Sequence, residues 1–340
     1  MTAKVTLQPS GHSYTVEPDE TVLEAALRSG LNLNYHCSNG TCGECRARLL
    51  EGTIHEIQHH DYVLSTTEKA QGQVLLCRAR IIDDIVVEAS EAGSIADIPV
   101  QELTTQVSSV ENPQQDITVL TLRTPRSQTL RFLAGQHVTI NIPGLSPRNK
   151  SIASCPCNGM FLQIHQRQIE GDSFSDYLFN QVRPREKIKV EGPFGGFVLD
   201  ETSQRPIIFL AFDTGFSSIK SLIEHAVSLD IPQAITLYWV MPYKRAHYLE
   251  NYCYSWQDAL DNFSYIPVCA MASEETKDDL NQAQNALVQA ASRVTDDHPD
   301  LSGFDVYITG PQAAMQVARH WLLAHGLIEQ QLFIDQIRRF

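Results

Sequence analysis

The sequence has no long apolar run and is short of positive charge. No apolar stretch approaches the about 18 residues of a membrane-spanning helix, and the opening MTAKVTLQPSGHSYTV has no apolar core long enough for a signal peptide. With 26 Lys and Arg against 40 Asp and Glu, the formal net charge is −14. Nucleic-acid phosphates and anionic membrane surfaces would both repel such a chain. We therefore expect no nucleic-acid partner, no membrane span and a cytoplasmic location.

The signatures of a hydrolase, a repeat protein and a disulfide-rich secreted protein are also missing. No G-x-S-x-G motif occurs, so a Ser/His/Asp hydrolase has little support. There is no internal repeat and no low-complexity tract. Eight cysteines in a chain of 340 residues without a signal peptide do not make a secreted disulfide framework, and four of them form one tight pattern. That pattern favours metal chemistry in a reducing compartment.

The chain divides into three regions of different composition. A length of 340 residues with 43% hydrophobic residues is enough for two or three domains with their own cores. Residues 1–90 hold short alternating runs, one short helix near TVLEAALRS and the cysteine cluster, and residues 91–100 are a linker. Residues 101–202 are strands separated by turn residues, which predicts an antiparallel barrel. In residues 203–340 strands alternate with helices, which predicts a doubly wound parallel sheet.

The strongest signal is the spacing of four cysteines. Cys37, Cys42 and Cys45 form the pattern C-x4-C-x2-C, and Cys77 follows 32 positions after Cys45. This is the plant-type spacing of a 2Fe-2S cluster, whose ligands are four thiolates. Three thiolates on one loop can surround the cluster, and the fourth closes the site from a distant turn. We therefore predict that these four cysteines bind a 2Fe-2S cluster.

Two glycines inside the cysteine loop support this prediction. Gly40 and Gly43 let the loop turn tightly and point backbone N–H groups at the sulfur atoms, with no Cβ in the way. The alternative is a zinc site. Zinc sites prefer paired C-x2-C motifs, and the sequence has one such pair in this region.

Two further groups of potential metal ligands are interpreted as structural. The C-P-C sequence has no partner pair, so four cysteines are taken as buried or incidental thiols: Cys155, Cys157, Cys253 and Cys269. A polar loop near residues 55–61 is taken as a solvated loop rather than a metal site, although it contains His55, Glu56, His59, His60 and Asp61.

With these neighbours, residues 1–90 resemble a plant-type ferredoxin domain at the N-terminus of a reductase. RNKSIAS, residues 148–154, resembles the R-x-Y-S-x-x-S segment of the ferredoxin-NADP reductase superfamily. The resemblance implies that Arg148 pairs with the flavin phosphate, a task that its charged planar fork suits, and that Ser151 lies near the flavin N5. Lys150 stands where the family has a tyrosine that packs on the isoalloxazine, and a lysine stem can still cover a ring.

Two later segments resemble other parts of the same flavin site. GDSFS, residues 171–175, resembles the family's glycine-to-serine turn, whose N–H groups and helix dipole hold the flavin pyrophosphate. Gly171 and Ser175 are the matching residues, and an ordinary helix N-cap is the alternative role for Ser175. EGPFGGF, residues 191–197, resembles the turn that ends the family's flavin barrel. The three segments together imply FAD rather than FMN, because the turn suits a diphosphate.

FLAFDTGFSS, residues 209–218, resembles the family's G-G-T-G-x-x-P nucleotide loop. Thr214 and Gly215 are retained, whereas Phe212 and Asp213 replace the two glycines and Ser218 replaces the proline. A phenyl ring and a carboxylate at these positions could obstruct the approach of a cofactor. A second role open to Asp213 is to cap the helix that follows.

Two other segments of this region depart from the family at contact positions. ITGPQAAM, residues 308–315, resembles a C-G-P-x-x-M turn; Gly310 and Pro311 are retained, and Thr309 replaces the cysteine that usually meets the nicotinamide. WVMPYKRAHYL, residues 239–249, resembles a strand end that usually reads G-x-R. Its glycine and arginine positions hold Val240 and Pro242, followed by Lys244 and Arg245. The choice between NADH and NADPH stays open, with a slight preference for NADH.

The resemblance covers essentially the whole chain. It implies a β-grasp ferredoxin domain, an antiparallel β-barrel flavin domain and a doubly wound nucleotide domain. The implied function is an NAD(P)H-dependent reductase that passes electrons from FAD through a 2Fe-2S cluster to an oxygenase or deoxysugar dehydrase component. The alternatives are an electron-transfer module that no longer binds nucleotide, and a flavin or ferric reductase without a protein acceptor. In some members a C-terminal aromatic residue shields the flavin, a role open to Phe340.

Overall fold

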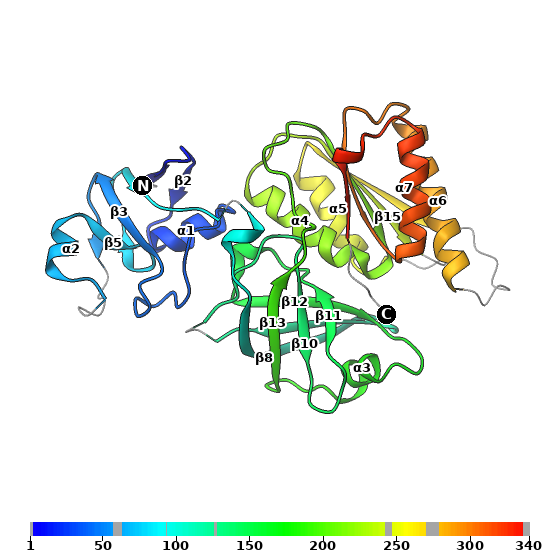
Figure 1. Ribbon diagram of the computed structural model, residues 1–340, viewed down its shortest axis with the longest axis horizontal. Helices are drawn as coiled ribbons and strands as arrows, with labels where there is room; N and C mark the ends of the chain where they lie inside the picture. Colours follow the sequence, from blue (N-terminus) through cyan, green and yellow to red (C-terminus); the bar gives the residue numbers. More distant parts are fainter. Residues whose placement is uncertain are drawn as a thin grey trace.

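The computed structural model contains three main β-sheets, one in each region expected from the sequence. It describes residues 3–56, 63–92, 94–125, 128–241, 247–269 and 279–335. Figure 1 shows the N-terminal sheet at one end of the molecule, while the barrel and the parallel sheet lie against each other. No helix in the described ranges combines the length and the apolar character needed to cross a membrane.

The N-terminal sheet is mixed and carries one helix on its apolar face. Its strand order is β2-β1-β7-β3-β5, and β1 and β7 run parallel while the other neighbours are antiparallel. The elements are β1 (Ala3–Gln8), β2 (Ser13–Val16), α1 (Val22–Arg28), β3 (Arg46–Glu51), α2 (Thr66–Ala70), β5 (Gln73–Leu75), the 3-10 turn η1 (Leu76–Arg78) and β7 (Ile85–Glu88). A two-stranded pair joins β4 (His55–Glu56) to β6 (Ala79–Arg80). Thr21 and Glu24 form a capping box that starts α1.

The second sheet is an antiparallel, nearly closed barrel of six strands. Its order is β11-β10-β13-β8-β9-β12. The strands are β8 (Gln101–Gln114), β9 (Ile117–Arg123), β10 (His137–Asn141), β11 (Arg148–Ser151), β12 (Phe161–Arg167) and β13 (Lys187–Phe194). Just after β11, the Ala153 N–H donates to the Gln163 carbonyl on β12 at 2.7 Å, which brings the two end strands together. The short helix α3 (Ser173–Asp176) and the π-helical turn 177–181 contribute Phe174 and Leu178 to the barrel core.

The third sheet is parallel and covered by helices on both faces. Its order is β16-β15-β14-β17-β18. The strands are β14 (Ile207–Phe212), β15 (Ile235–Met241), β16 (Phe263–Cys269), β17 (Asp305–Thr309) and β18 (Leu332–Ile334), and the helices are α4 (Phe216–Ser228), α5 (Glu250–Ala259), α6 (Asp279–Asp297) and α7 (Gln312–Ala324). One face of β14 packs with α4 and α5, and the other face packs with α6 and α7. Burial on both faces explains why β14 reads IIFLAF, without a polar residue.

Polar contacts fix the barrel against both of its neighbours. On the N-terminal side, the N–H and the hydroxyl of Thr129 both donate to the His36 carbonyl at 3.2 Å, and Arg131 Nη2 donates to Asn34 Oδ1 at 2.7 Å. On the other side, the Ser221 hydroxyl of α4 donates to the Ser154 carbonyl at 2.8 Å. The barrel therefore lies between the cysteine-bearing domain and the parallel sheet.

One expectation about the cysteines was wrong. Cys155 and Cys157 are joined in a disulfide, because the 3-10 turn at Pro156–Asn158 brings their Cα atoms to 5.2 Å. Cys253 is buried and Cys269 is exposed, and both are free thiols.

The packing of α4 on the parallel sheet generates a stability prediction. Phe216 is fully buried and stacks on Trp239, with ring centroids 3.8 Å apart. Phe216→Ala should lower the free energy of unfolding of this domain by about 3–5 kcal/mol, because it removes a large buried ring and leaves a cavity. All three tryptophans, Trp239, Trp256 and Trp321, lie in this domain, so tryptophan fluorescence during urea unfolding measures it.

Val227→Ala on the same helix is the matched control. Val227 is 37% exposed, and its replacement should change stability by no more than about 0.5 kcal/mol. Equal effects of the two substitutions would contradict the packing described for α4.

Candidate functional site

The four predicted cluster ligands come together in the N-terminal domain. Cys37, Cys42 and Cys45 lie on the loop between α1 and β3, and Cys77 lies in η1 after β5. Cys45 Sγ and Cys77 Sγ are 3.2 Å apart, and the Cys42 N–H lies 3.3 Å from Cys37 Sγ. Cys42 is exposed and the other three are buried. The thiols thus form two adjacent pairs with one of them at the surface.

The cysteine loop points backbone N–H groups at the sulfur atoms. The N–H groups of Thr41 and Cys42 donate to Cys37 Sγ at 3.4 and 3.3 Å, and the Glu44 N–H donates to Cys42 Sγ at 3.4 Å. Burial raises the pKa of Cys37, but these hydrogen bonds outweigh it and lower the pKa to about 6. Such N–H donors favour the thiolate and are a feature of iron–sulfur sites.

The glycines predicted to shape this loop have the required backbone conformation. Gly40 and Gly43 have φ of +83° and +81°, which disfavours any residue with a Cβ. A Cβ on Gly40 would also lie 2.8 Å from Arg78 Cγ. Within the described residues, no three His, Cys, Asp or Glu side chains surround one point as a single metal ion would require. The C-x4-C-x2-C spacing with Cys77, instead of two C-x2-C pairs, fits a 2Fe-2S cluster better than zinc.

The predicted flavin phosphate contacts lie together at the start of α3. Arg148 opens β11, and its Nη2 lies 2.7 Å from Asp172 Oδ1. The other oxygen of Asp172 accepts the Ser175 N–H at 2.8 Å. Burial raises the pKa of Asp172, but the hydrogen bonds from Arg148 and the Ser175 N–H have the larger effect. The net result is a lowered pKa, so the group is a carboxylate. An anion is thus held between a guanidinium and a helix N-terminus, and this donor set suits a phosphate.

The side chain of Ser175 forms hydrogen bonds to the backbone just before its own turn. It is fully buried, and its hydroxyl accepts the Ile169 N–H at 2.8 Å and donates to the Arg167 carbonyl at 3.4 Å. The N-cap of α3 is Asp172, so the N-cap interpretation of Ser175 was wrong. Gly171 has φ of +77°, which suits the turn before α3.

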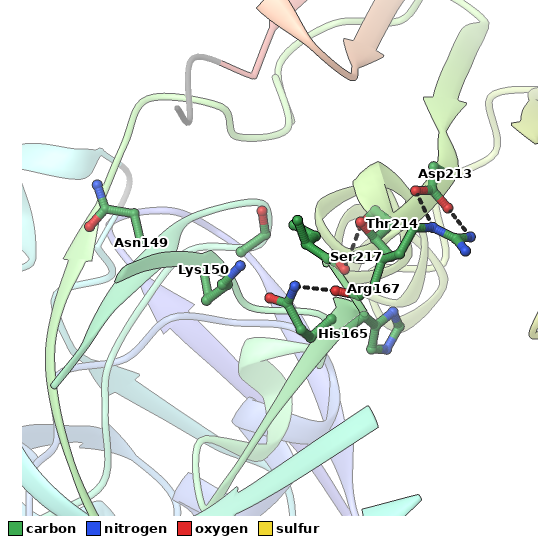
Figure 2. A pocket seen from close by; sticks show the side chains of 10 residues that line it. Asn149, Lys150, His165, Arg167, Asp213, Thr214 and Ser217 are labelled. Atoms are coloured by element: carbon green, nitrogen blue, oxygen red, sulfur yellow. Dashed lines mark hydrogen bonds and ion pairs between the residues drawn. The ribbon is translucent and has the colours of Figure 1, made fainter. Parts of the chain in front are cut away.

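A cavity of about 100 Å³ lies between the barrel and the loop after β14 (Figure 2). Lys150 and Ser151 of β11 line it on one side, and Thr214 lines it on the other. Lys150 Nζ lies 5.3 Å from the centre of the Phe174 ring, so its stem crosses an apolar surface. The remaining lining residues are Asn149, His165, Gln166, Arg167, Ile169, Asp213 and Ser217. The cavity is where the barrel and the nucleotide loop face each other.

The predicted nucleotide contacts lie at the point where the strand order of the parallel sheet reverses. Thr214 and Gly215 follow β14, Gly310 and Pro311 follow β17, and these two strands are neighbours with Ala211 opposite Thr309. In open parallel sheets, ligands bind at the carboxyl ends of the strands at such a point. The geometry therefore brings the four residues to one place, although nearly one hundred residues separate the two loops.

The ring of Phe212 does not obstruct the predicted nucleotide contacts after β14 and β17. Phe212 continues the face of β14 that contains Ile208 and Leu210, and it is buried in the core beneath α6 and α7. A Cβ on Gly310 would lie 3.1 Å from Phe212 Cβ, so the glycine leaves room for the phenylalanine. The prediction that Phe212 could obstruct the approach of a cofactor was wrong.

Asp213 does not cap α4. Its φ is +50°, and its two carboxylate oxygens accept hydrogen bonds from Arg167 Nε and Nη2 at 2.7 and 2.6 Å. No side chain caps the start of α4. Arg167 was missed in the sequence; the signal for it was the polar run HQR at the end of β12, beside the flavin segments.

The other departures are buried in the described residues or lie outside them. The Ser218 hydroxyl donates to Asp335 Oδ2 at 2.9 Å, Thr309 is fully buried, and Val240 is fully buried. His55 lies on β4. Several residues fall outside the described ranges: His59, His60, Asp61, Pro242, Lys244, Arg245 and Phe340.

Known domain families match the three parts of the chain in the order of the three sheets. The 2Fe-2S iron-sulfur cluster binding domain matches residues 5–81, the oxidoreductase FAD-binding domain matches residues 104–199, and the oxidoreductase NAD-binding domain matches residues 209–320. The CDP-6-deoxy-L-threo-D-glycero-4-hexulose-3-dehydrase reductase of Yersinia pseudotuberculosis is 31% identical over 335 residues, which are 98% of each chain. The protein belongs to the iron–sulfur flavoprotein reductases.

Other members of this reductase family have the same extent. The reductase component of phenol 2-monooxygenase from Pseudomonas sp. is 27% identical and aligns over 99% of this chain and 94% of its own. A solved cytochrome P450 reductase from Amycolatopsis has the same fold, with a TM-score of 0.61, 23% identity and 98% of each chain covered. The predicted fold class, the reductase function and the three cofactor-binding domains, for a 2Fe-2S cluster, FAD and NAD, are confirmed.

The position of Cys77 generates a prediction about the cluster. Cys77→Ser should abolish bound iron and acid-labile sulfide, because it removes one of four thiolates, while FAD content stays at the wild-type level. Iron, sulfide and FAD analyses of the purified protein measure this. Cys269→Ser, at an exposed free thiol on β16, should change none of the three. Retention of the full iron content in Cys77→Ser would contradict the predicted ligand set.

The position of Arg148 at the start of α3 generates a second prediction. Arg148→Ala should raise the dissociation constant of FAD at least about tenfold, since a hydrogen bond to a charged group contributes about 1.5–3 kcal/mol. Titration of the apoflavoprotein with FAD measures the constant. Arg123→Ala, at an exposed arginine on β9, is the control of equal charge change. A similar loss of affinity in both variants would mean that Arg148 acts only through the overall charge.

Proposed function

We propose that a nicotinamide nucleotide reduces this protein at the cavity between the barrel and the loop after β14, and that an acceptor protein is reduced at the cysteine loop. A nicotinamide supplies two electrons as a hydride, a flavin holds one or two, and a 2Fe-2S cluster carries one. The observation that carries the proposal is the central position of the barrel. Residues 34–36 contact it on one side through Thr129 and Arg131, and the nucleotide loop contacts it on the other side through Arg167.

We propose the following roles for the residues of the site. The four thiolates of Cys37, Cys42, Cys45 and Cys77 hold the cluster. Arg148 and the turn from Gly171 to Ser175 hold the flavin diphosphate, with Ser175 acting through its position in the turn because its hydroxyl is used internally. Lys150 and Ser151 border the flavin ring. Thr214, Gly215, Gly310 and Pro311 border the nicotinamide nucleotide.

We further propose that the acceptor is an oxygenase or a dehydrase component. Support comes from the relatives, whose names describe a reductase for a dehydrase and reductase components of monooxygenases. In this chain, the exposed residues of the cysteine loop are Ser38, Asn39, Thr41, Cys42 and Glu44, and we propose that the acceptor contacts them. We place the protein in the cytoplasm, where reducing conditions keep the cluster thiols available.

A second candidate function is an electron-transfer module that has lost nucleotide binding. The observation in its favour is the carboxylate of Asp213 in the nucleotide loop, where an anionic ligand would be repelled. In this case the flavin would be reduced by another protein.

Anaerobic mixing with nucleotide separates the two functions. On addition of NADH or NADPH, the visible absorbance of both the flavin and the cluster should decrease, and the preferred nucleotide should be the one that acts at the lower concentration. Stopped-flow spectroscopy measures the rates. If dithionite bleaches both groups but neither nucleotide does, the hydride-acceptor proposal fails and the electron-transfer module is correct.

A further inference from the structure

The turn between β14 and α4 carries a negative charge where an anionic ligand is expected. In doubly wound folds, the pyrophosphate of a dinucleotide lies at the first turn from strand to helix, next to the helix N-terminus. Here Asp213 is the first residue of that turn. Two like charges brought together at a binding site cost several kcal/mol. A free carboxylate at this position would therefore oppose the binding of a nucleotide.

Arg167 of the barrel forms an ion pair with this carboxylate. Its Nε and Nη2 donate to the two oxygens of Asp213 at 2.7 and 2.6 Å, which is the bidentate geometry of a strong guanidinium–carboxylate pair. The side chains of Arg167 and Asp213 are only 19% and 14% exposed. Figure 2 shows the two side chains facing each other across the boundary between the barrel and the loop.

The backbone of the loop is set so that Asp213 reaches the barrel. Its φ of +50° is uncommon for a residue other than glycine. Trp239 Nε1 donates to the Asp213 carbonyl at 3.0 Å and holds the backbone in this conformation. Arg167 also pairs through Nη1 with Asp116, in the turn before β9, so the guanidinium is anchored from its own domain. Asp116 thus gives the guanidinium a second carboxylate partner within the barrel.

We propose that Arg167 is a charge-compensating, positioning residue for the nucleotide: it holds the Asp213 carboxylate against the barrel, so that the loop can accept a pyrophosphate. This inference rests on the proposed use of a nicotinamide nucleotide. It means that Arg167 acts on the ligand through Asp213, and that the aspartate in the loop is tolerated because the barrel supplies a cation. This role predicts how single and double substitutions of Arg167 and Asp213 rank in their effect on nucleotide affinity.

Isothermal titration of the oxidised holoenzyme with NAD+ tests this order. Arg167→Gln leaves the Asp213 charge uncompensated and should raise the dissociation constant about tenfold or more. Asp213→Asn removes the repelling charge while Arg167 remains, and should lower the constant by about twofold or more. The double variant, Arg167→Gln with Asp213→Asn, lacks the Asp213 carboxylate that repels the ligand. Its dissociation constant should therefore return to near the wild-type value.

Three controls accompany the titration. Arg167→Lys keeps the charge and should recover most of the affinity that Arg167→Gln loses. Arg123→Gln makes the same change of net charge at an exposed arginine of the barrel and should leave the constant unchanged. The defect of Arg167→Gln should shrink as salt is raised, because ions screen the repulsion. FAD and iron contents report whether each variant is folded and loaded.

Two outcomes would overturn the inference. If Asp213→Asn weakens NAD+ binding as much as Arg167→Gln, the pair is only a link between the domains. If the double variant stays as weak as Arg167→Gln, Arg167 contacts the ligand directly. Absence of NAD+ binding by the wild-type protein, together with absence of reduction by NADH or NADPH, is a different result, since it refutes the proposed function itself.

Discussion

The position of the nucleotide domain depends on one face of helix α4. Lys220 Nζ donates to the Ala153 carbonyl at 3.2 Å, and Glu224 Oε2 accepts the Cys155 N–H at 3.0 Å. Lys220 and Glu224 pair with each other at 2.6 Å, which makes a buried lysine acceptable because its charge has a partner. These contacts hold the backbone at the end of the flavin segment. They therefore fix the loop after β14 beside the barrel, and the cavity that Lys150 and Thr214 share is a result of this docking.

Much of the architecture could be predicted because it follows from local sequence patterns. The period of the strands and helices gave three regions, and the cysteine spacing gave a ligand set whose members lie together. The direction of Phe212 was also accessible, because it follows Ile208 and Leu210 in the alternation of a strand that is buried on both faces.

Contacts between domains could not be predicted in the same way. Arg167 and Asp213 are 46 positions apart on elements of different domains, and no periodicity relates them. The sequence left the N-cap of α3 open to Ser175 as an alternative role, because serine and aspartate are both good caps. The choice of Asp172 depends on Arg148, which stabilises the carboxylate from another strand. Similarly, the Cys155–Cys157 disulfide depends on the turn at Pro156.

The contact between Phe212 and Gly310 has a consequence for how this loop can change over evolution. A Cβ at residue 310 would lie 3.1 Å from both Phe212 Cβ and Leu287 Cδ1, so a side chain there requires these neighbours to shift. Conversely, a glycine at 212 would leave the space beside Leu287 and Met315 empty and destabilise the core. A sequence path from this loop to a glycine-rich one therefore has a stability cost unless residues of α6 or α7 change as well. The helices behind the sheet thus restrict which nucleotide loops the family can reach from this protein in single steps.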